Sequence, residues 1–111
     1  VMLQVNTADS ASQSGAHPGQ VMELAGRVAE LPSLKICGLM TIGAHSDDEH
    51  TVRASFARLR VLKDSLQAAG IASISMRHLS MGMSGDFEWA IAEGSTMLRL
   101  GTALFGARDL V

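Results

Sequence analysis

The residues best suited to chemistry lie in two short loops near the end of the chain, each tied to an apolar run at residues 74–83 or 97–105. Backbone N–H groups approach an anion closely where side chains are small, and hydroxyls add further donors. Either loop alone is more simply a turn, but the pair predicts an anion site like the phosphate site after the last two strands of a β/α barrel. The small residues are Ser80, Gly82, Ser84 and Gly85 in the first loop, and Gly101 and Thr102 in the second.

Arg99 is the charged side chain within the second apolar run. Because successive side chains of a strand alternate between its faces, Arg99 lies on the face opposite Leu98 and Leu100. If the leucines face surrounding helices, the guanidinium points into the interior, where an unpaired charge is strongly destabilising. Its expected partner is therefore either an acid of this chain, such as Asp86 or Glu93, or a bound group.

Strands and helices are expected to alternate along the chain. Apolar runs predict four strands, and amphipathic patterns predict helices between them. This alternation indicates an α/β fold with a parallel sheet, whose right-handed crossovers bring all strand carboxyl ends to one rim. The expected strands are Val1–Asn6, Leu34–Ile42, a third within Ile71–Met83 and Met97–Leu104; the expected helices are Gln20–Glu30, His50–Ala69 and Asp86–Glu93.

The length of the chain limits how much of a closed barrel it supplies. A β/α barrel needs roughly 250 residues, and this chain has 111 and begins inside an expected strand without an initiator methionine. We therefore expect the C-terminal half of a parallel β/α (TIM-type) barrel, with about four βα units. Residues 1–111 would form a single partial domain, with the N-terminal half of the barrel absent from this chain.

Composition excludes several classes of function. Hydrophobic residues make up 47% and charged residues 18%, which is typical of a globular domain. A net charge of −2 argues against a nucleic-acid partner, and no apolar run approaches the length of a membrane span. The single Cys37 is expected to be a small buried hydrophobe, and the location cytoplasmic. Residues 45–50 suggest a helix start with Ser46 and Glu49 at capping-box spacing, so no metal site is expected.

Three stretches of sequence resemble one known family. LSMGMS at residues 79–84, EGSTMLRLGTALFG at 93–106 and GLMTIG at 38–43 are similar to the pyridoxal-phosphate homeostasis family of alanine-racemase-like β/α barrels. The resemblance runs from about Val1 to Arg108. One departure is Ser12-Gln13-Ser14-Gly15, where the family usually has Ser-Lys-x-Gly, so a role for a basic residue at position 13 is in doubt.

The resemblance implies a cofactor, pyridoxal 5′-phosphate (PLP). Its phosphate would be held by Ser80 or Ser84 with Gly82 from the first loop, and by Gly101 and Thr102 from the second. Arg99 would face the pyridine nitrogen, where a permanent cation keeps that nitrogen unprotonated and weakens the ring as an electron sink. Met81 is either a ring-packing residue or part of the core. No catalytic residue is assigned.

Such a cofactor normally binds a Schiff-base lysine. The sequence holds two lysines, Lys35 at the start of an expected strand and Lys63 within a helix, and neither is placed to reach Arg99 or Thr102. The resemblance implies that the lysine comes from a strand upstream of this chain.

Three functions remain open at this stage. The first is a PLP-binding homeostasis protein without strong turnover, with PLP-dependent apo-enzymes as its candidate partners. The second is a racemase or decarboxylase of the same fold, which usually needs a further Tyr or Cys; this chain has no Tyr, and Cys37 lies away from the rim. The third is a barrel that binds another phosphorylated metabolite.

Overall fold

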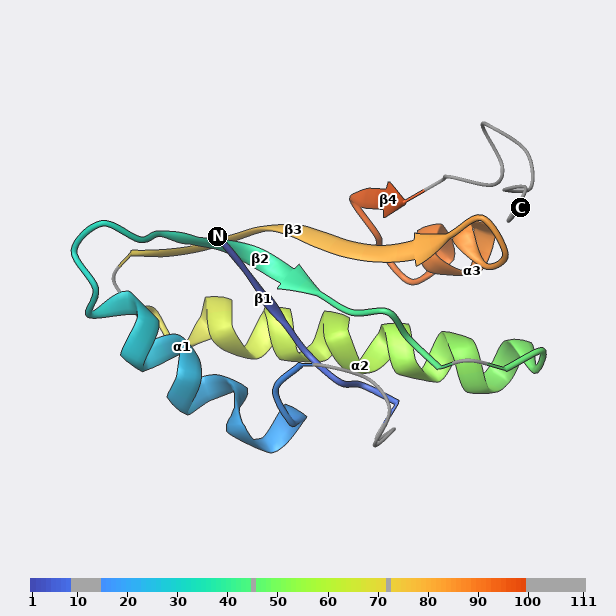
Figure 1. Ribbon diagram of the computed structural model, residues 1–111, viewed down its shortest axis with the longest axis horizontal. Coiled ribbons are helices and arrows are strands. Elements are labelled where there is room, and N and C mark those ends of the chain that lie inside the picture. Colours follow the sequence, from blue (N-terminus) through green and yellow to red (C-terminus); the bar gives the residue numbers. More distant parts are fainter. Residues whose placement is uncertain (9–14, 45, 72, 100–111) are drawn as a thin grey trace, which may run out of the picture.

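The computed structural model describes residues 1–8, 15–44, 46–71 and 73–99. Helices and strands alternate along these residues, as Figure 1 shows. In chain order the elements are β1 (Met2–Gln4), the 3-10 turn η1 (Pro18–Gln20), α1 (Val21–Ala29), β2 (Ile36–Met40), α2 (Glu49–Ala68), β3 (Ile74–Met83), α3 (Phe87–Ala92) and β4 (Met97–Arg99).

The strands of the described residues form one sheet in the order β1-β2-β3-β4. Each neighbouring pair is parallel, with Leu3 beside Leu39, Leu39 beside Leu79, and Ser80 beside Met97. The arrowheads of β2, β3 and β4 point the same way in Figure 1, so their carboxyl ends share an edge. The predicted parallel α/β sheet is thus confirmed.

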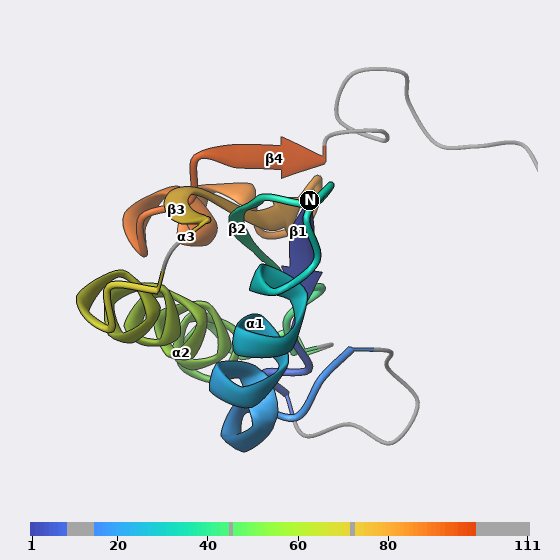
Figure 2. The ribbon, with the colours of Figure 1, turned by 90° about the vertical axis from the view of Figure 1, so that its left-hand side faces the viewer.

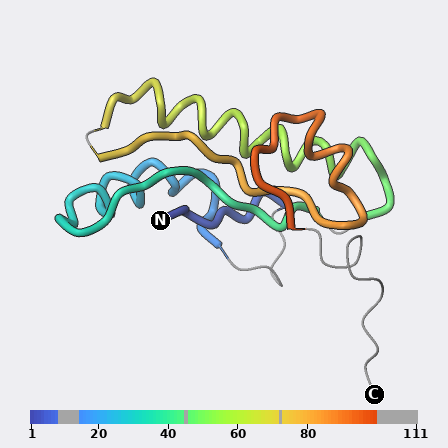
Figure 3. The backbone as a smooth tube through the Cα atoms, turned by 90° about the horizontal axis from the view of Figure 1, so that it is seen from above, coloured from blue at the N-terminus to red at the C-terminus, as the bar shows by residue number. Residues whose placement is uncertain are grey.

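Both long helices cover the same face of this sheet. Figure 2 shows α1 and α2 together on one side, and Figure 3 shows α2 running along β3. The amphipathic helix expected over His50–Ala69 is confirmed as α2, because four of its apolar side chains are buried and Leu62 packs against the core. Those four are Val52, Phe56, Leu59 and Leu66.

Two local expectations were wrong. Ser46 and Glu49 do not form the expected capping box of α2. Asp48 caps the helix instead, because its carboxylate accepts the Thr51 N–H at 2.9 Å, while Ser46 Oγ accepts the Asp48 N–H. An N-cap carboxylate satisfies an amide that the helix itself leaves free. Cys37 is half-buried rather than buried, and its thiol donates to the Val1 carbonyl at 3.4 Å.

Candidate functional site

Arg99 reaches from β4 to the end of β2. Its Nη2 donates to the carbonyl oxygen of Thr41 at 2.6 Å. Leu98 packs against the hydrophobic core, so alternation puts Arg99 on the opposite face of the strand, as predicted. Among the described residues the Arg99 Nε is buried without a hydrogen-bond partner. A buried donor of this kind needs an acceptor, and the guanidinium can still supply that bond to a further group.

The acids considered as partners for Arg99 are engaged elsewhere. Asp86 Oδ1 accepts the N–H of Met83 at 2.7 Å. Both carboxylate oxygens of Glu93 are bound by Arg53 and Arg60 of α2. An ion pair with Asp86 or Glu93 therefore does not explain why a cation stands at this position.

Thr41 and Thr7 form a buried hydroxyl network between the ends of β1 and β2. The Thr41 Oγ1 donates to the Val5 carbonyl at 2.7 Å and accepts the Gly43 N–H at 3.3 Å. A hydroxyl has one proton, so the 3.0 Å contact between the two threonines uses the proton of Thr7. The network fixes the peptide group whose carbonyl holds Arg99. Sequence analysis missed it, although a hydroxyl residue at the end of two successive apolar strands was a visible signal.

The end of β3 lies on the other side of Thr41. Ser80 is 4% exposed, and its carbonyl accepts the Thr41 N–H at 3.1 Å. Thr41 therefore brings Ser80 and Arg99 to one edge of the sheet. Their part in a cofactor site stays a prediction. Beyond this strand, Ser84 is half-buried in a turn. A hollow of about 220 Å³ follows, lined by Ser84, Gly85, Asp86, Phe87, Glu88 and Trp89.

Asp86 closes the turn after β3. Asp86 precedes α3, as expected of a residue at a helix start, but its side chain caps no helix N–H. Its carboxylate instead accepts the Met83 N–H, and its own N–H donates to the Met83 carbonyl at 3.1 Å. These two bonds fix the loop that carries Ser84.

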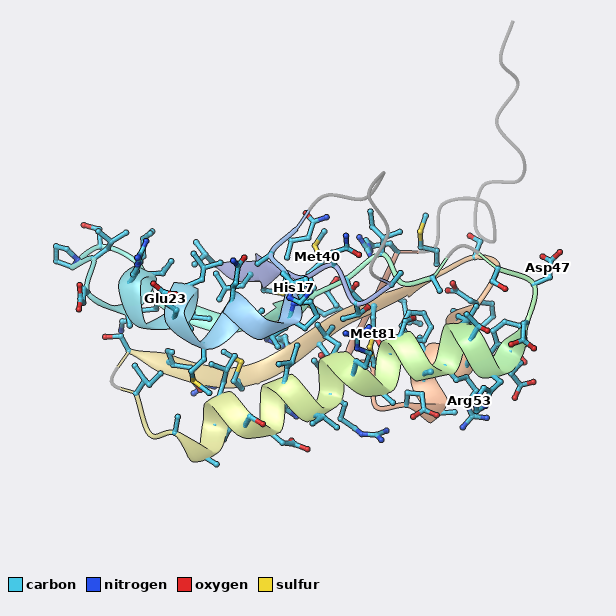
Figure 4. The ribbon with its side chains drawn as sticks, turned by 90° about the horizontal axis from the view of Figure 1, so that it is seen from below. His17, Glu23, Met40, Asp47, Arg53 and Met81 are labelled. Carbon is cyan, nitrogen blue, oxygen red and sulfur yellow. The ribbon has the colours of Figure 1, made fainter. Side chains whose placement is uncertain are left out.

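Met81 and Gly82 have packing roles in the structure. Met81 is fully buried in the hydrophobic core, and Figure 4 shows it close to α2 in projection. Gly82 has a φ of 104°. A Cβ there would lie 2.6 Å from the Cβ of Ala90 and 2.9 Å from the Cδ2 of Leu98, so glycine lets α3 and β4 approach the strand.

Some predicted features lie outside what the structure describes. Gly101 and Thr102 are not among the described residues, so their part in an anion site stays a prediction.

Lys35 directly precedes β2, at the opposite edge from Thr41, and Lys63 lies on α2. Across the described ranges no three His, Cys, Asp or Glu side chains gather as metal ligands. No helix of the same residues is long and apolar enough to cross a membrane.

A parallel sheet with its helices on one face, and with polar groups gathered at the strand carboxyl ends, defines a β/α protein of the barrel class. The chain belongs to the alanine racemase, N-terminal domain family, whose model matches residues 1–109. The family resemblance and the fold class expected from the sequence are both confirmed.

Known relatives extend this comparison. The chain is 47% identical to the pyridoxal phosphate homeostasis protein of Vibrio alginolyticus, over 98% of this chain and 46% of that protein. It is similar to a crystal structure of an unknown protein from Bifidobacterium adolescentis, with a TM-score of 0.91, 45% identity, and coverage of 95% of this chain and 42% of that one. PipY of Synechococcus elongatus, solved with PLP bound, matches with a TM-score of 0.80 and 32% identity, over 95% and 48%. The chain thus spans about half the length of the relatives it matches.

Proposed function

We propose that this chain is the C-terminal half of a PLP-binding β/α barrel that acts in cofactor homeostasis without strong turnover of its own. One observation carries the proposal: Arg99 reaches the carboxyl edge of the sheet and keeps a buried Nε without a partner among the described residues. The family, the homeostasis relatives and the PLP-bound PipY support the choice of cofactor. A cytoplasmic location stays a prediction.

The residues of this chain would hold two ends of the cofactor. Arg99 would face the ring nitrogen, since its free Nε suits an acceptor atom. Ser80 and Ser84 from β3 and its turn, with Gly101 and Thr102 of the sequence motif, would hold the phosphate. Bound PLP supplies a reactive aldehyde on an electron-withdrawing ring. A fixed cation beside that nitrogen keeps it unprotonated, which limits the ring's power to stabilise a carbanion.

The lysine that would meet the aldehyde is proposed to lie in the other half of the barrel. Lys35 is at the wrong edge of the sheet, and Lys63 is on a helix. The longer protein that carries this segment is therefore the one to test.

A racemase or decarboxylase of the same fold is the alternative, because the matching family is named for a racemase. Such enzymes need a second acid or base, and the half-buried Cys37 bonds back to Val1 at the start of the sheet instead. The carrier function fits this chain better. Exchange of PLP with apo-enzymes would be its role in the cell.

The test is a titration of the longer protein with PLP, followed by absorbance. We expect saturable, stoichiometric binding with a visible band, and no racemisation or decarboxylation of amino acids above the rate of free PLP. Sustained turnover would favour the enzyme alternative. Tight binding of another phosphorylated metabolite, with no visible band from PLP, would favour the third function.

A further inference from the structure

Glu93 ends α3 and is held by two arginines of α2. Its Oε2 accepts from Arg53, at 2.8 Å from Nε and 2.7 Å from Nη2, and its Oε1 accepts from the Arg60 Nη1 at 2.9 Å. The same Nη1 donates to the Glu93 backbone carbonyl at 3.1 Å. Figure 4 shows Arg53 beside α3. We call Arg53, Arg60 and Glu93 the carboxylate clamp.

The clamp is a strong contact for a surface helix. The Glu93 side chain is 13% exposed, whereas the side chains of Arg53 and Arg60 are 38% and 41% exposed. Hydrogen bonds between a guanidinium and a carboxylate are charge-assisted and stronger than bonds between neutral groups. Arg53, followed by Arg60, lowers the pKa of Glu93, and this outweighs the effect of burial. Glu49, one turn before Arg53, holds the first arginine in place at 3.2 Å.

The segment from Glu93 to Arg99 is short and is hydrogen-bonded to β3. Ser95 Oγ contacts the Met81 carbonyl at 2.6 Å. Thr96 N–H donates to the Leu79 carbonyl at 3.0 Å, and its hydroxyl accepts the Leu79 N–H at 2.9 Å. β4 begins at the next residue and pairs with β3. Glu93 therefore stands at the start of a short segment that is hydrogen-bonded to β3 and leads directly into β4.

We propose that Glu93, held by Arg53 and Arg60, is a positioning residue for the proposed cofactor site at the carboxyl edge of the sheet. The clamp ties the end of α3 to the rigid α2, and through the short segment into β4 it sets where the Arg99 guanidinium lies. This inference rests on the proposed function and deepens it, because it names residues on the outer surface that govern how the ring end of PLP is held.

The test compares Glu93→Gln with wild type in the longer protein. The amide keeps the shape of Glu93 but removes its charge. We expect PLP to bind roughly tenfold more weakly, the size typical of a residue that acts through a packed network. We also expect the visible band of the bound cofactor to shift at saturation, because the cation beside the ring nitrogen has moved. A purely structural role would leave that band in place.

Glu23→Gln is the matched control. Glu23 pairs with Arg27 at 2.7 Å on α1, but both side chains are exposed, at 67% and 76%. Loss of such a pair has little effect, so binding and spectrum should match the wild type. If Glu93→Gln is too unstable to assay, Arg60→Met removes one cation and leaves both Arg53 bonds. It should weaken binding by a smaller factor.

Hydrogen exchange of the PLP-free protein measures the effect of the clamp on β4 separately from its effect on PLP binding. Amides of residues 95–99 should exchange faster in Glu93→Gln than in wild type or Glu23→Gln. Unchanged affinity, spectrum and exchange in the Glu93 and Arg60 variants would overturn the positioning role. A wild type that fails to bind PLP would overturn the proposed function and the cofactor part of this inference, while the exchange data would still report whether the clamp orders β4.

Discussion

In the proposed function, we expect PLP recognition to depend more on Arg99 than on any other described residue. Replacing it with Met keeps the length of the apolar stem and removes both the Thr41 contact and the free Nε donor. Hydrogen bonds to charged groups contribute about 1.5–3 kcal/mol, so we expect PLP to bind about ten- to a hundredfold more weakly to Arg99→Met in the longer protein. Fluorescence titration measures this. Arg99→Lys keeps the charge but not the planar guanidinium, so its affinity for PLP should lie between those of the wild type and Arg99→Met. Equal affinity in all three would remove Arg99 from the site.

The Thr41 hydroxyl should contribute to stability out of proportion to its size. Thr41→Val keeps the shape but removes the donor to the Val5 carbonyl and one acceptor of the Gly43 N–H. An unsatisfied buried polar group costs about 1–3 kcal/mol, and urea denaturation of the longer protein should show a loss in this range. The control is Thr51→Val, whose exposed hydroxyl bonds Asp48, with an expected loss of about 0.5 kcal/mol because water replaces that bond. Equal losses would contradict the buried network.

Single residues also show how far the sequence could predict the site. Arg99 was predictable, because alternation along one apolar strand fixes which face a side chain takes. The contacts of Thr41 were missed: hydroxyl residues at two strand ends were visible, but their partners Val5 and Thr7 are more than thirty residues away in sequence. The role of Glu93 was missed for the same reason, because both arginines that bind it lie on another helix.

At the scale of elements, the packing of α3 and β4 against β3 depends on Gly82. Gly82→Ala must place a Cβ 2.6 Å from that of Ala90 while keeping a φ of 104°. Backbone strain and overpacking each cost about 1–3 kcal/mol, so we expect a total loss of about 2–6 kcal/mol in the longer protein. Gly85→Ala is the control, since a Cβ at Gly85 meets nothing within 4 Å. A Gly82 variant as stable as the Gly85 variant would contradict this packing.

The carboxylate clamp should make the α2–α3 contact sensitive to acid. Arg53 is the main cause that lowers the pKa of Glu93 below its usual 4.5, so the stabilisation is present above that value. It is lost as the pH falls through the lower, folded-state pKa. Urea midpoints measured from about pH 6 to pH 3 should therefore fall more steeply in wild type than in Glu93→Gln, which has no proton to gain. Parallel pH profiles would show that the clamp does not contribute to stability.

Element boundaries show what periodicity can and cannot predict. The stripe of α2 was clear over five turns, because a long amphipathic pattern leaves few alternatives. The first two strands proved shorter than their apolar runs: β1 covers Met2–Gln4 rather than Val1–Asn6, and β2 covers Ile36–Met40 rather than Leu34–Ile42. Beyond these ends Val5 is buried, whereas Val1, Leu34 and Ile42 are 36–54% exposed, so apolar composition alone does not mark where pairing stops.

At the scale of the whole molecule, the sheet has two ends that a closed barrel would join. In the described residues β1 and β4 are the outer strands. The β1 side is partly covered, because Ala16 exchanges backbone hydrogen bonds with Gln4 and Asn6. Large apolar side chains near the sheet, such as Ile42, Met83 and Met97, are 38–45% exposed. These features fit the proposal that a second half completes the barrel.

The last prediction concerns these 111 residues expressed alone. They hold Arg99 and Ser80 but no lysine at the carboxyl edge, so stoichiometric PLP should form no specific bond with them. Their outer strands should also make the isolated piece associate, since an uncovered strand edge offers backbone groups to another chain. Borohydride reduction followed by peptide mapping is the measurement, with the longer protein as the positive control. The longer protein should give one modified lysine outside this segment, and the segment alone should give weak labelling spread between Lys35, Lys63 and the N-terminus. A single stoichiometric adduct at Lys35 or Lys63 would mean that the cofactor site is elsewhere and that half a barrel is enough to build it.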